Sequence, residues 1–581
     1  MRKSARPNER QTGTTGRWNF APLLALLTGL LIAPPARADW LPVGRIETES
    51  IQSLTYGLSA FCRCAGIPYN LMDLNQLIAQ RLAIPNLAGI DLRERVVLHL
   101  LVDGDAPRAS ARVATLAVVA LADNGATLLA NLNAVHARRE EQVWGVIFTA
   151  PREGFSGHDR LAVSLRGGKA YLADTPDVIA WAMKPGRTVL TSPAGSGQLL
   201  VTANPSELGA CLSATNAMLA AVKLPTFSLL PTGLVERAFV RLPDLIEQTE
   251  ALSLSLNANG HALSATLNLA FKPASPRQAW LTRSRPHERW YGALAPNAAT
   301  LATVASQSGR GGWRELLGWT PAPHLPTLDE LVGDRLTGDS LVYIDQTRTG
   351  DGIALVAVAK VIDPGEVRRR LAKNLDGRVL PSGLSIVRTA DRRHNTSDIQ
   401  CFSLTNSAAA KNPTLIPIEP STLNALAGLL AKITVIETTV VGQDMALVAG
   451  PSGSIEAVID DLHSGRPPYA MLPERSRLLA QDVPVDASSV ALLKPVAMLR
   501  QIIATLPGYK TEQMAAFALP GDGLFAWSRV KDGHYTGTLR IAANEVDALQ
   551  NVLTRGRPII QELLLQMVMQ QILGQPESVR R

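Results

Sequence analysis

Two cysteines stand within three positions of each other, at Cys62 and Cys64. Thiolates at this spacing bind zinc only when further cysteines or histidines complete the ligand set. No second pair and no histidine lies nearby, and the second half of the chain has no cysteine at the matching place. We therefore interpret Cys62 and Cys64 as a candidate disulfide or as two inert thiols, and we predict no metal site.

Two other patterns contain residue types used in catalysis. Ser528-Arg529-Val530-Lys531 fits S-x-x-K, but the alternating sequence around it predicts a strand, on which residues three apart point to opposite faces. His261 and His534 each follow a turn and have no acidic or cysteine partner at useful spacing, so both are interpreted as structural. Zinc-protease, nucleophile-elbow, phosphate-loop and dinucleotide motifs do not occur. The sequence predicts no catalytic residue and no cofactor.

Tryptophans are concentrated in one stretch of a chain that has only 5% aromatic residues. Trp290, Trp313 and Trp319 lie within 30 residues, next to the Pro-rich TPAPHLPTL. They would form a hydrophobic plug between two domains or line a cleft for a glycan or peptide, since ligands favour domain interfaces. These three residues are the candidate ligand-binding residues, and both interpretations stay open.

The sequence segments that would position a site occur twice in the chain, as an internal repeat. Residues 265–286 match 537–558 without a gap at an offset of 272, and both segments end on Leu-Thr-Arg-(Ser/Gly)-Arg-Pro. Earlier matches, at offsets of 235, 240, 246, 252 and 273, pair Tyr56-Gly57 with Tyr291-Gly292, Asp123-Asn124-Gly125 with Asp363-Pro364-Gly365, Ala203–Ser206 with Ala449–Ser452, Pro243 with Pro495, and Asn259-Gly260-His261 with Asp532-Gly533-His534. This ordered series predicts a whole-domain duplication, with copy one at 45–286 and copy two at 287–558.

The repeated unit is a short apolar strand, a turn and an amphipathic helix, as in 169–183, 198–212 and 444–462. A helix-start signal, such as Thr175-Pro176, follows the strand. Alternating hairpins at 252–271 and 523–543 precede the end of each copy. The sequence therefore predicts an α+β fold, made twice, with mostly antiparallel sheets covered by helices.

These strand–(Asn/Asp/Ser)-Pro–helix units, closed by an alternating hairpin and a helix, resemble a broad group of exported bacterial proteins known only as domains of unknown function. The resemblance covers most of the chain after residue 38. It implies an envelope or secreted location, and it offers no catalytic residues to transfer.

Residues 1–38 have the pattern of a cleaved signal peptide. A basic segment that ends at Arg17 precedes the apolar stretch Phe20–Ala33, and Ala36-Arg37-Ala38 forms a small-x-small cleavage site. This stretch of 14 residues is shorter than the about 20 of a membrane span, although an uncleaved anchor is the alternative. The segment carries six Lys/Arg and one Asp/Glu, so cleavage after Ala38 lowers the net charge from +7 to +2. A periplasmic or secreted protein that does not bind nucleic acid is expected.

The C-terminal tail, 559–581, lies outside the duplication. Its segment 559–574 predicts an amphipathic helix, whose apolar residues include Ile560, Leu563, Leu564, Met567, Val568 and Ile572. Glu562 and four glutamines in only 16 residues argue against a membrane span. The helix is expected to pack on copy two, and the alternative is a homo-oligomer or partner contact.

Export, duplication and the lack of catalytic motifs favour a non-enzymatic protein. We expect it to bind a ligand or an envelope partner, such as a glycan or peptide, at the interface of the two domains. The alternatives are an exported hydrolase whose site is assembled from dispersed residues, and a structural subunit that assembles through the C-terminal helix.

Overall fold

The computed structural model describes most of the two predicted copies. The described residues are 40–67, 75–76, 79, 84, 87–104, 113–143, 145–151, 160–184, 197–205, 245–283, 301–306, 328–346, 353–379, 384–406, 435–464, 484, 486–504, 521–556 and 562. The predicted signal peptide lies outside them, as does the C-terminal tail apart from Glu562. Their predicted roles therefore stay predictions.

The chain is mostly β, and the predicted α+β class is wrong. The strands are β1 (Trp40–Thr48), β2 (Val96–Asp103), β3 (Val113–Ala120), β4 (Arg138–Gln142), β5 (Gly145–Pro151), β6 (Arg160–Arg166), β7 (Lys169–Ala173), β8 (Leu199–Ala203), β9 (Thr249–Ala258), β10 (Ala262–Phe271), β11 (Leu301–Ser306), β12 (Leu336–Gln346), β13 (Ile353–Val361), β14 (Leu384–Arg388), β15 (Arg392–His394), β16 (Ser397–Asn406), β17 (Val435–Val441), β18 (Asp444–Gly450), β19 (Ser489–Leu493), β20 (Leu524–Lys531) and β21 (His534–Ala542).

The helices are short and cover only parts of the sheet. They are α2 (Ile51–Cys64), α4 (Ala126–Ala134), α5 (Pro176–Ala182), α8 (Pro276–Arg283), α10 (Leu328–Val332), the 3-10 turn η4 (Gly333–Arg335), α11 (Pro364–Leu375), α13 (Ser454–Ser464), α15 (Pro495–Ala504), α16 (Ala543–Asn551) and the π-helical turn η7 (Val552–Gly556). Helix-start signals such as Thr175-Pro176 do begin helices. The α+β expectation failed because these helices are short and successive hairpins supply most of the fold between them.

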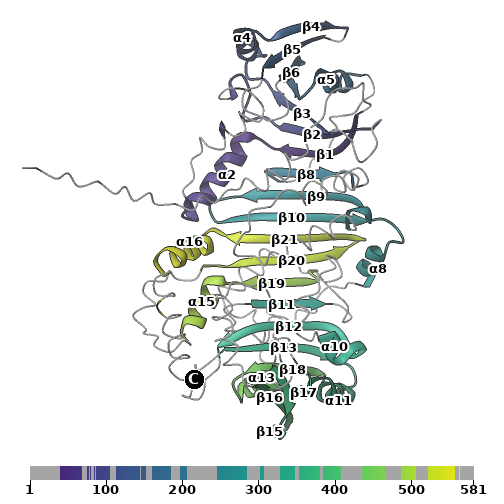
Figure 1. Ribbon diagram of the computed structural model, residues 1–581, viewed down its shortest axis with the longest axis vertical. Coiled ribbons are helices and arrows are strands. Elements are labelled where there is room, and N and C mark those ends of the chain that lie inside the picture. Colours follow the sequence, from purple (N-terminus) through teal and green to yellow (C-terminus); the bar gives the residue numbers. More distant parts are fainter. Residues whose placement is uncertain are drawn as a thin grey trace, which may run out of the picture.

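The strands pair antiparallel in one long series, which Figure 1 shows as a ladder. The order is β4–β5–β6–β7–β3–β2–β1–β8–β9–β10–β21–β20–β19–β11–β12–β13–β18–β17–β16–β14, and β15 also pairs with β16. The β4 end of the ladder curls. β4 itself reads Arg-Arg-Glu-Glu-Gln, and such charge on an edge strand opposes edge-to-edge association.

Copy two repeats the pairing order of copy one. The series β6–β7–β3–β2–β1–β8–β9–β10 has the same connectivity as β17–β18–β13–β12–β11–β19–β20–β21. Leu254 pairs with Leu267 in the first hairpin, and Ala526 pairs with Leu539 in the second. The offset between these hairpins is 272, as in the gap-free sequence match.

The two copies join through the hairpin strands β10 and β21. Thr266 lies directly opposite Thr538, and their hydroxyl oxygens are 3.0 Å apart. At the offset of 272 these two threonines are equivalent residues, so each meets its own counterpart. A local pseudo-twofold axis therefore passes between them, and the junction has the self-complementary form of a twofold dimer interface.

The pairings also correct the alignment of the copies. Asn204-Pro205 follows β8, whose counterpart is β19, and therefore matches Lys494-Pro495 instead of Gly450-Pro451. Gly450-Pro451 stands at the end of β18 and matches Thr175-Pro176 after β7. The sequence comparison failed here because a strand followed by a proline occurs twice in each copy. Pro243, Tyr291 and Gly292 lie outside the described residues.

In each copy, separate helices cover the two faces of the sheet at the end far from the junction, which in copy one is formed by β3, β5, β6 and β7. α4 packs on one face through Leu128 and Leu132, and α5 packs on the other through Val178 and Ile179. α11 and α13 take the corresponding places in copy two. Near the junction, α2 and α16 share an apolar cluster with β9 and β10, which contains Phe61, Cys62, Ala65, Ala258 and Ala543, with Leu58, Ile67, Leu263 and Val546 packed against it.

α2 approaches β9 closely at a glycine. A Cβ on Gly57 would overlap the carbonyl oxygen of Ala258, whereas a Cβ on Gly365 of α11 would have no neighbour nearer than 3.8 Å. Glycine at position 57 therefore sets the distance between α2 and the hairpin strands.

We predict that Gly57→Ala destabilises the protein by about 1–3 kcal/mol, because the added methyl group pushes α2 off β9. The matched control, Gly365→Ala, is expected to be neutral or stabilising, since alanine favours the helix where there is space. Urea unfolding of both variants measures the difference. Equal stabilities for the two variants would contradict this account of α2 packing.

Candidate functional site

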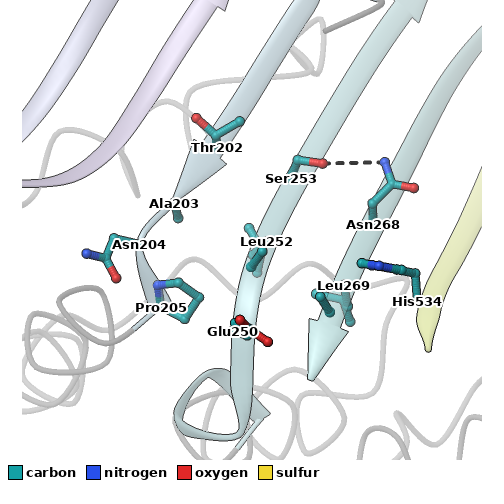
Figure 2. A pocket seen from close by; sticks show the side chains of 12 residues that line it. Thr202, Ala203, Asn204, Pro205, Glu250, Leu252, Ser253, Asn268, Leu269 and His534 are labelled. Carbon is teal, nitrogen blue, oxygen red and sulfur yellow. Dashed lines mark hydrogen bonds between the residues drawn. The ribbon is translucent and has the colours of Figure 1, made fainter. Parts of the chain in front are cut away.

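A pocket of about 430 Å³ opens where four strands of the two copies meet (Figure 2). It lies at the end of β8, the start of β9, the end of β10 and the start of β21. The lining residues are Thr202, Ala203, Asn204, Pro205, Glu250, Ala251, Leu252, Ser253, Asn268, Leu269, Ala270 and His534. All of them belong to copy one except His534, so the pocket crosses the junction of the copies.

A β-bulge places Glu250 in the pocket lining. Ala251 pairs with Ala270 and Thr249 pairs with Phe271, so Glu250 is an extra residue with no partner position on β10. A bulge of this kind breaks the alternation of side chains and redirects one of them. Glu250 thereby supplies the carboxylate in the lining.

A hydrogen-bonded chain orients the amide of Asn268 on the pocket wall. The Thr536 hydroxyl donates to Asn268 Oδ1 at 2.9 Å, and Asn268 Nδ2 donates to Ser253 Oγ at 3.4 Å. His534 lies opposite Ala270, two residues from Thr536 on β21, and is exposed. The polar groups therefore come from both sides of the junction and face the same side of the sheet.

Copy two differs at the corresponding place. At the offset of 272, Phe525 replaces Ser253, Arg540 replaces Asn268 and Ala262 replaces His534. The start of α16 packs there as well, since Glu545 accepts a hydrogen bond from Val496 N at 3.0 Å and Asn544 bonds Asp522 at 3.1 Å. The polar set of the pocket is thus absent from the place that the pseudo-twofold axis relates to it.

The local sequence explains why copy one leaves this place open. In copy one, Lys272 and Pro273 stand at the positions equivalent to Asn544 and Glu545. They belong to a turn, so helix α8 begins only at Pro276. In copy two, α16 begins directly after β21, at Ala543. Proline at 273 and a left-handed φ of 62° at Ala274 keep this segment from continuing as helix.

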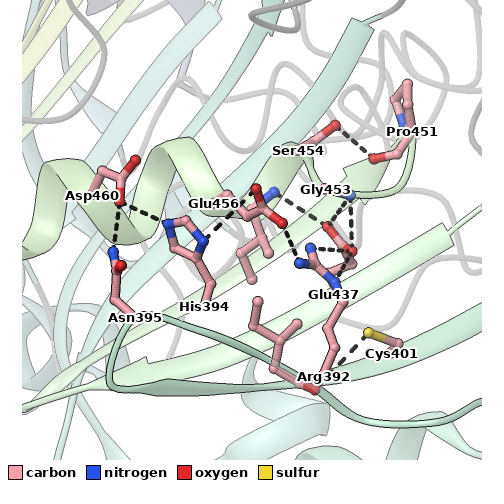
Figure 3. Close-up of polar contacts among 12 residues, drawn as sticks. Arg392, His394, Asn395, Cys401, Glu437, Pro451, Gly453, Ser454, Glu456 and Asp460 are labelled. Atoms are coloured by element: carbon pink, nitrogen blue, oxygen red, sulfur yellow. Dashed lines mark hydrogen bonds and ion pairs between the residues drawn. The ribbon is translucent and has the colours of Figure 1, made fainter.

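A second polar cluster lies in copy two, between the β15–β16 hairpin and α13 (Figure 3). Glu437 is 1% exposed, and Arg392 Nη2 lies 2.8 Å from its carboxylate. The same carboxylate accepts hydrogen bonds from Gly453 N at 3.0 Å and Ile455 N at 3.2 Å, where it caps the start of α13. Copy one has Ala162 at the position equivalent to Glu437.

The remaining contacts of this cluster fasten the hairpin to the helix. His394 Nε2 lies 2.8 Å from Asp460 Oδ1, and Asn395 donates to the same oxygen at 3.1 Å. Glu456 contacts both Arg392 and His394. Burial raises the pKa of the nearby Cys401 thiol, which disfavours the reactive thiolate. The cluster therefore has a structural role.

We predict that Glu437→Ala costs about 3 kcal/mol of stability, because it leaves Arg392 without its buried partner and removes the cap of α13. The double variant Arg392→Met/Glu437→Leu is expected to recover much of that loss. Urea denaturation of both proteins gives the comparison. A double variant no more stable than Glu437→Ala would show that the unpaired charge is not the cause.

Copy one buries charge at a different place, on β1 and β2. Arg45 lies 2.5 Å from Glu47, and Arg95 contacts the same carboxylate. His99 lies directly opposite Arg45 and is 4% exposed. Burial, with a smaller contribution from Arg45, lowers the pKa of His99 to about 4.

We predict that stability falls by about 3 kcal/mol as the pH drops from 6.5 toward 4. The pKa of His99 is lower in the folded state than the ordinary 6.5, so the unfolded chain takes up its proton first and acid favours unfolding. Copy two has Tyr343 at the position equivalent to His99, so an aromatic ring fits there. The variant His99→Phe should flatten this pH dependence. The free energy of unfolding measured at pH 6.5 and 5 separates His99 from most carboxylates, and an unchanged slope in the variant would refute the assignment.

The residues predicted from sequence have different outcomes. Trp290, Trp313 and Trp319 lie outside the described residues. Cys62 is buried and Cys64 is exposed on α2, and both are free thiols, so the candidate disulfide is not formed. Residues two apart on a helix point in different directions, which explains why the two thiols do not meet.

The pocket itself was not among the features predicted from the sequence. His534 was interpreted as an inert turn residue, and Glu250, Ser253 and Asn268 were not singled out. One available signal was the interrupted alternation at Thr249-Glu250-Ala251, which is typical of a bulge. The contribution of His534 depends on the β10–β21 pairing, which joins residues far apart in the chain.

No group of three or more metal-ligating side chains occurs among the described residues, and none of their helices has the length and apolarity needed to cross a membrane. Comparison of the whole chain with known protein families, curated proteins and solved structures gives no match.

Proposed function

We propose that this chain is an exported, non-enzymatic binding protein that holds a saccharide in the pocket at the junction of its two copies. The observation that carries this proposal is the lining of the pocket, in which Glu250, Ser253, Asn268 and His534 meet across β9, β10 and β21. Domain junctions are common places for ligands, and about 430 Å³ falls within the usual range of small-molecule pockets.

The chemistry of the lining favours a neutral, hydroxyl-rich ligand. A carboxylate, two amides, hydroxyls and an imidazole supply both donors and acceptors, which matches the alternating donor and acceptor groups of a sugar. Among the described lining residues there is no Lys or Arg to bind a phosphate or carboxylate group. Pro205 and Ala270 add apolar surface for the carbon skeleton.

Binding is favoured over hydrolysis by the number of carboxylates. Most glycosidases place two acidic residues on either side of the scissile bond. Glu250 is the only acidic residue among the described residues of the lining. The signal-peptide pattern at residues 1–38 supports a periplasmic or secreted location, where a glycan ligand is accessible.

Calorimetric titration with β-1,4-linked oligomers of glucose and of N-acetylglucosamine tests the proposal. We expect at least one series to bind, and Asn268→Ala or His534→Ala to weaken its binding about tenfold, since each removes a hydrogen-bonding group. His261→Ala is the matched control, because His261 also follows a hairpin turn and does not line the pocket. The proposal fails if neither series binds or if Asn268→Ala binds like the unaltered protein.

A further inference from the structure

A row of polar side chains continues from the pocket into copy two. Thr202 lies opposite Ser253, Ser253 opposite Asn268, Asn268 opposite Thr536, and Thr536 opposite Arg529. Directly opposed residues of antiparallel strands place their side chains on the same face. The row therefore crosses five neighbouring strands, a distance of about 19 Å at the usual strand spacing.

The two ends of the row differ in accessibility. Beyond Thr202 the next opposed residue is Arg45, whose side chain is 13% exposed and pairs with buried Glu47. At the other end, the Arg529 side chain is 33% exposed and lies 3.7 Å from Asp486. The copy-one end is thus closed by buried charges, whereas the copy-two end is accessible.

An aromatic side chain stands beside the accessible end. Trp527 lies opposite Thr538 and two residues before Arg529 on β20, so both side chains are on the face that carries the row. Trp527 is partly buried against Val490 and Phe525. A tryptophan held in this way offers a ring for apolar contact and an indole N–H for a hydrogen bond.

We infer that Trp527 and Arg529 form a second saccharide subsite, so that the ligand is a linear oligosaccharide lying across the strands from the pocket into copy two. This inference rests on the proposed function of the pocket. Thr536 connects the two subsites, because it lies opposite Arg529 and its hydroxyl orients Asn268. Asp486 lies close enough to Arg529 to offset its charge, which is consistent with a neutral chain.

The pairing of the strands favours a ligand that contacts side chains over a peptide that adds a strand to the sheet. A peptide that binds a sheet by strand addition needs an unpaired edge. β9, β10, β21 and β20 each have hydrogen-bonded neighbours on both sides. Their backbone groups are therefore engaged, and the side chains on the face remain to make contacts.

The test is the dependence of affinity on chain length, measured by calorimetry with oligomers of two, four and six units from the series that binds. We expect the unaltered protein to bind the hexamer about tenfold more tightly than the dimer. The variants Arg529→Gln and Trp527→Ala should bind the hexamer no more tightly than the two-unit oligomer, and their affinity for the two-unit oligomer should be unchanged. Tryptophan emission should change on adding the hexamer, and Trp527→Phe should reduce that change.

The outcomes separate the two proposals. Equal length dependence in the unaltered protein and in Arg529→Gln would overturn the second subsite and leave the pocket intact. Binding of no oligomer would overturn the saccharide proposal itself. Circular dichroism of each variant checks folding, and Arg529→Gln keeps the test decisive if Trp527→Ala, which removes a partly buried ring, does not fold.

Discussion

The antiparallel pairing of β10 with β21 is the contact on which the rest of the architecture depends. It joins two copies of one topology into a single series of strands and brings Thr266 against its own counterpart, Thr538. In a homodimer this arrangement would bury a strand edge that each subunit otherwise exposes, and an exposed edge invites aggregation. Fusion into one chain makes the pairing intramolecular and permanent, and it removes the dependence of assembly on concentration.

Fusion also allows the halves to diverge, which symmetry forbids in a homodimer. At one of two equivalent places, helix α16 begins at once and its first residues pack against 521–523. At the other place, a Lys-Pro-Ala-Ser turn delays α8, and the polar pocket forms. Buried polar side chains differ in the same way, because His99 stands where copy two has Tyr343, and Glu437 stands where copy one has Ala162. The scaffold is shared and its polar residues are not.

The sequence predicted correctly those features that depend on neighbouring residues along the chain. Gap-free similarity revealed the hairpin match at an offset of 272, and the turns before Pro176 and Pro364 do begin helices. The predicted fold class was wrong because the sequence signals of helices are easy to recognise, whereas strands such as β4 and β15 are short and polar and were not recognised as strands. Pairing between distant strands has no local signature. The pocket was therefore missed, since it needs His534 next to Ala270, a contact between the copies.

The central strands separate two kinds of surface, and this separation bears on function. On one face, leucines of β9 and β10 pack in an apolar cluster with Leu281 of α8 and Tyr535 of β21, and Ala258 and Leu263 join the cluster beneath α2 and α16. On the other face, equivalent positions carry Ser253, Asn268 and Thr536, which bond one another instead of packing against a helix of the described chain. Hydroxyl and amide side chains on central strands contribute little hydrophobic stabilisation, so packing alone does not explain them. The proposed saccharide site would explain them, because it needs a hydrated polar surface, and the pocket lies on this face at the junction.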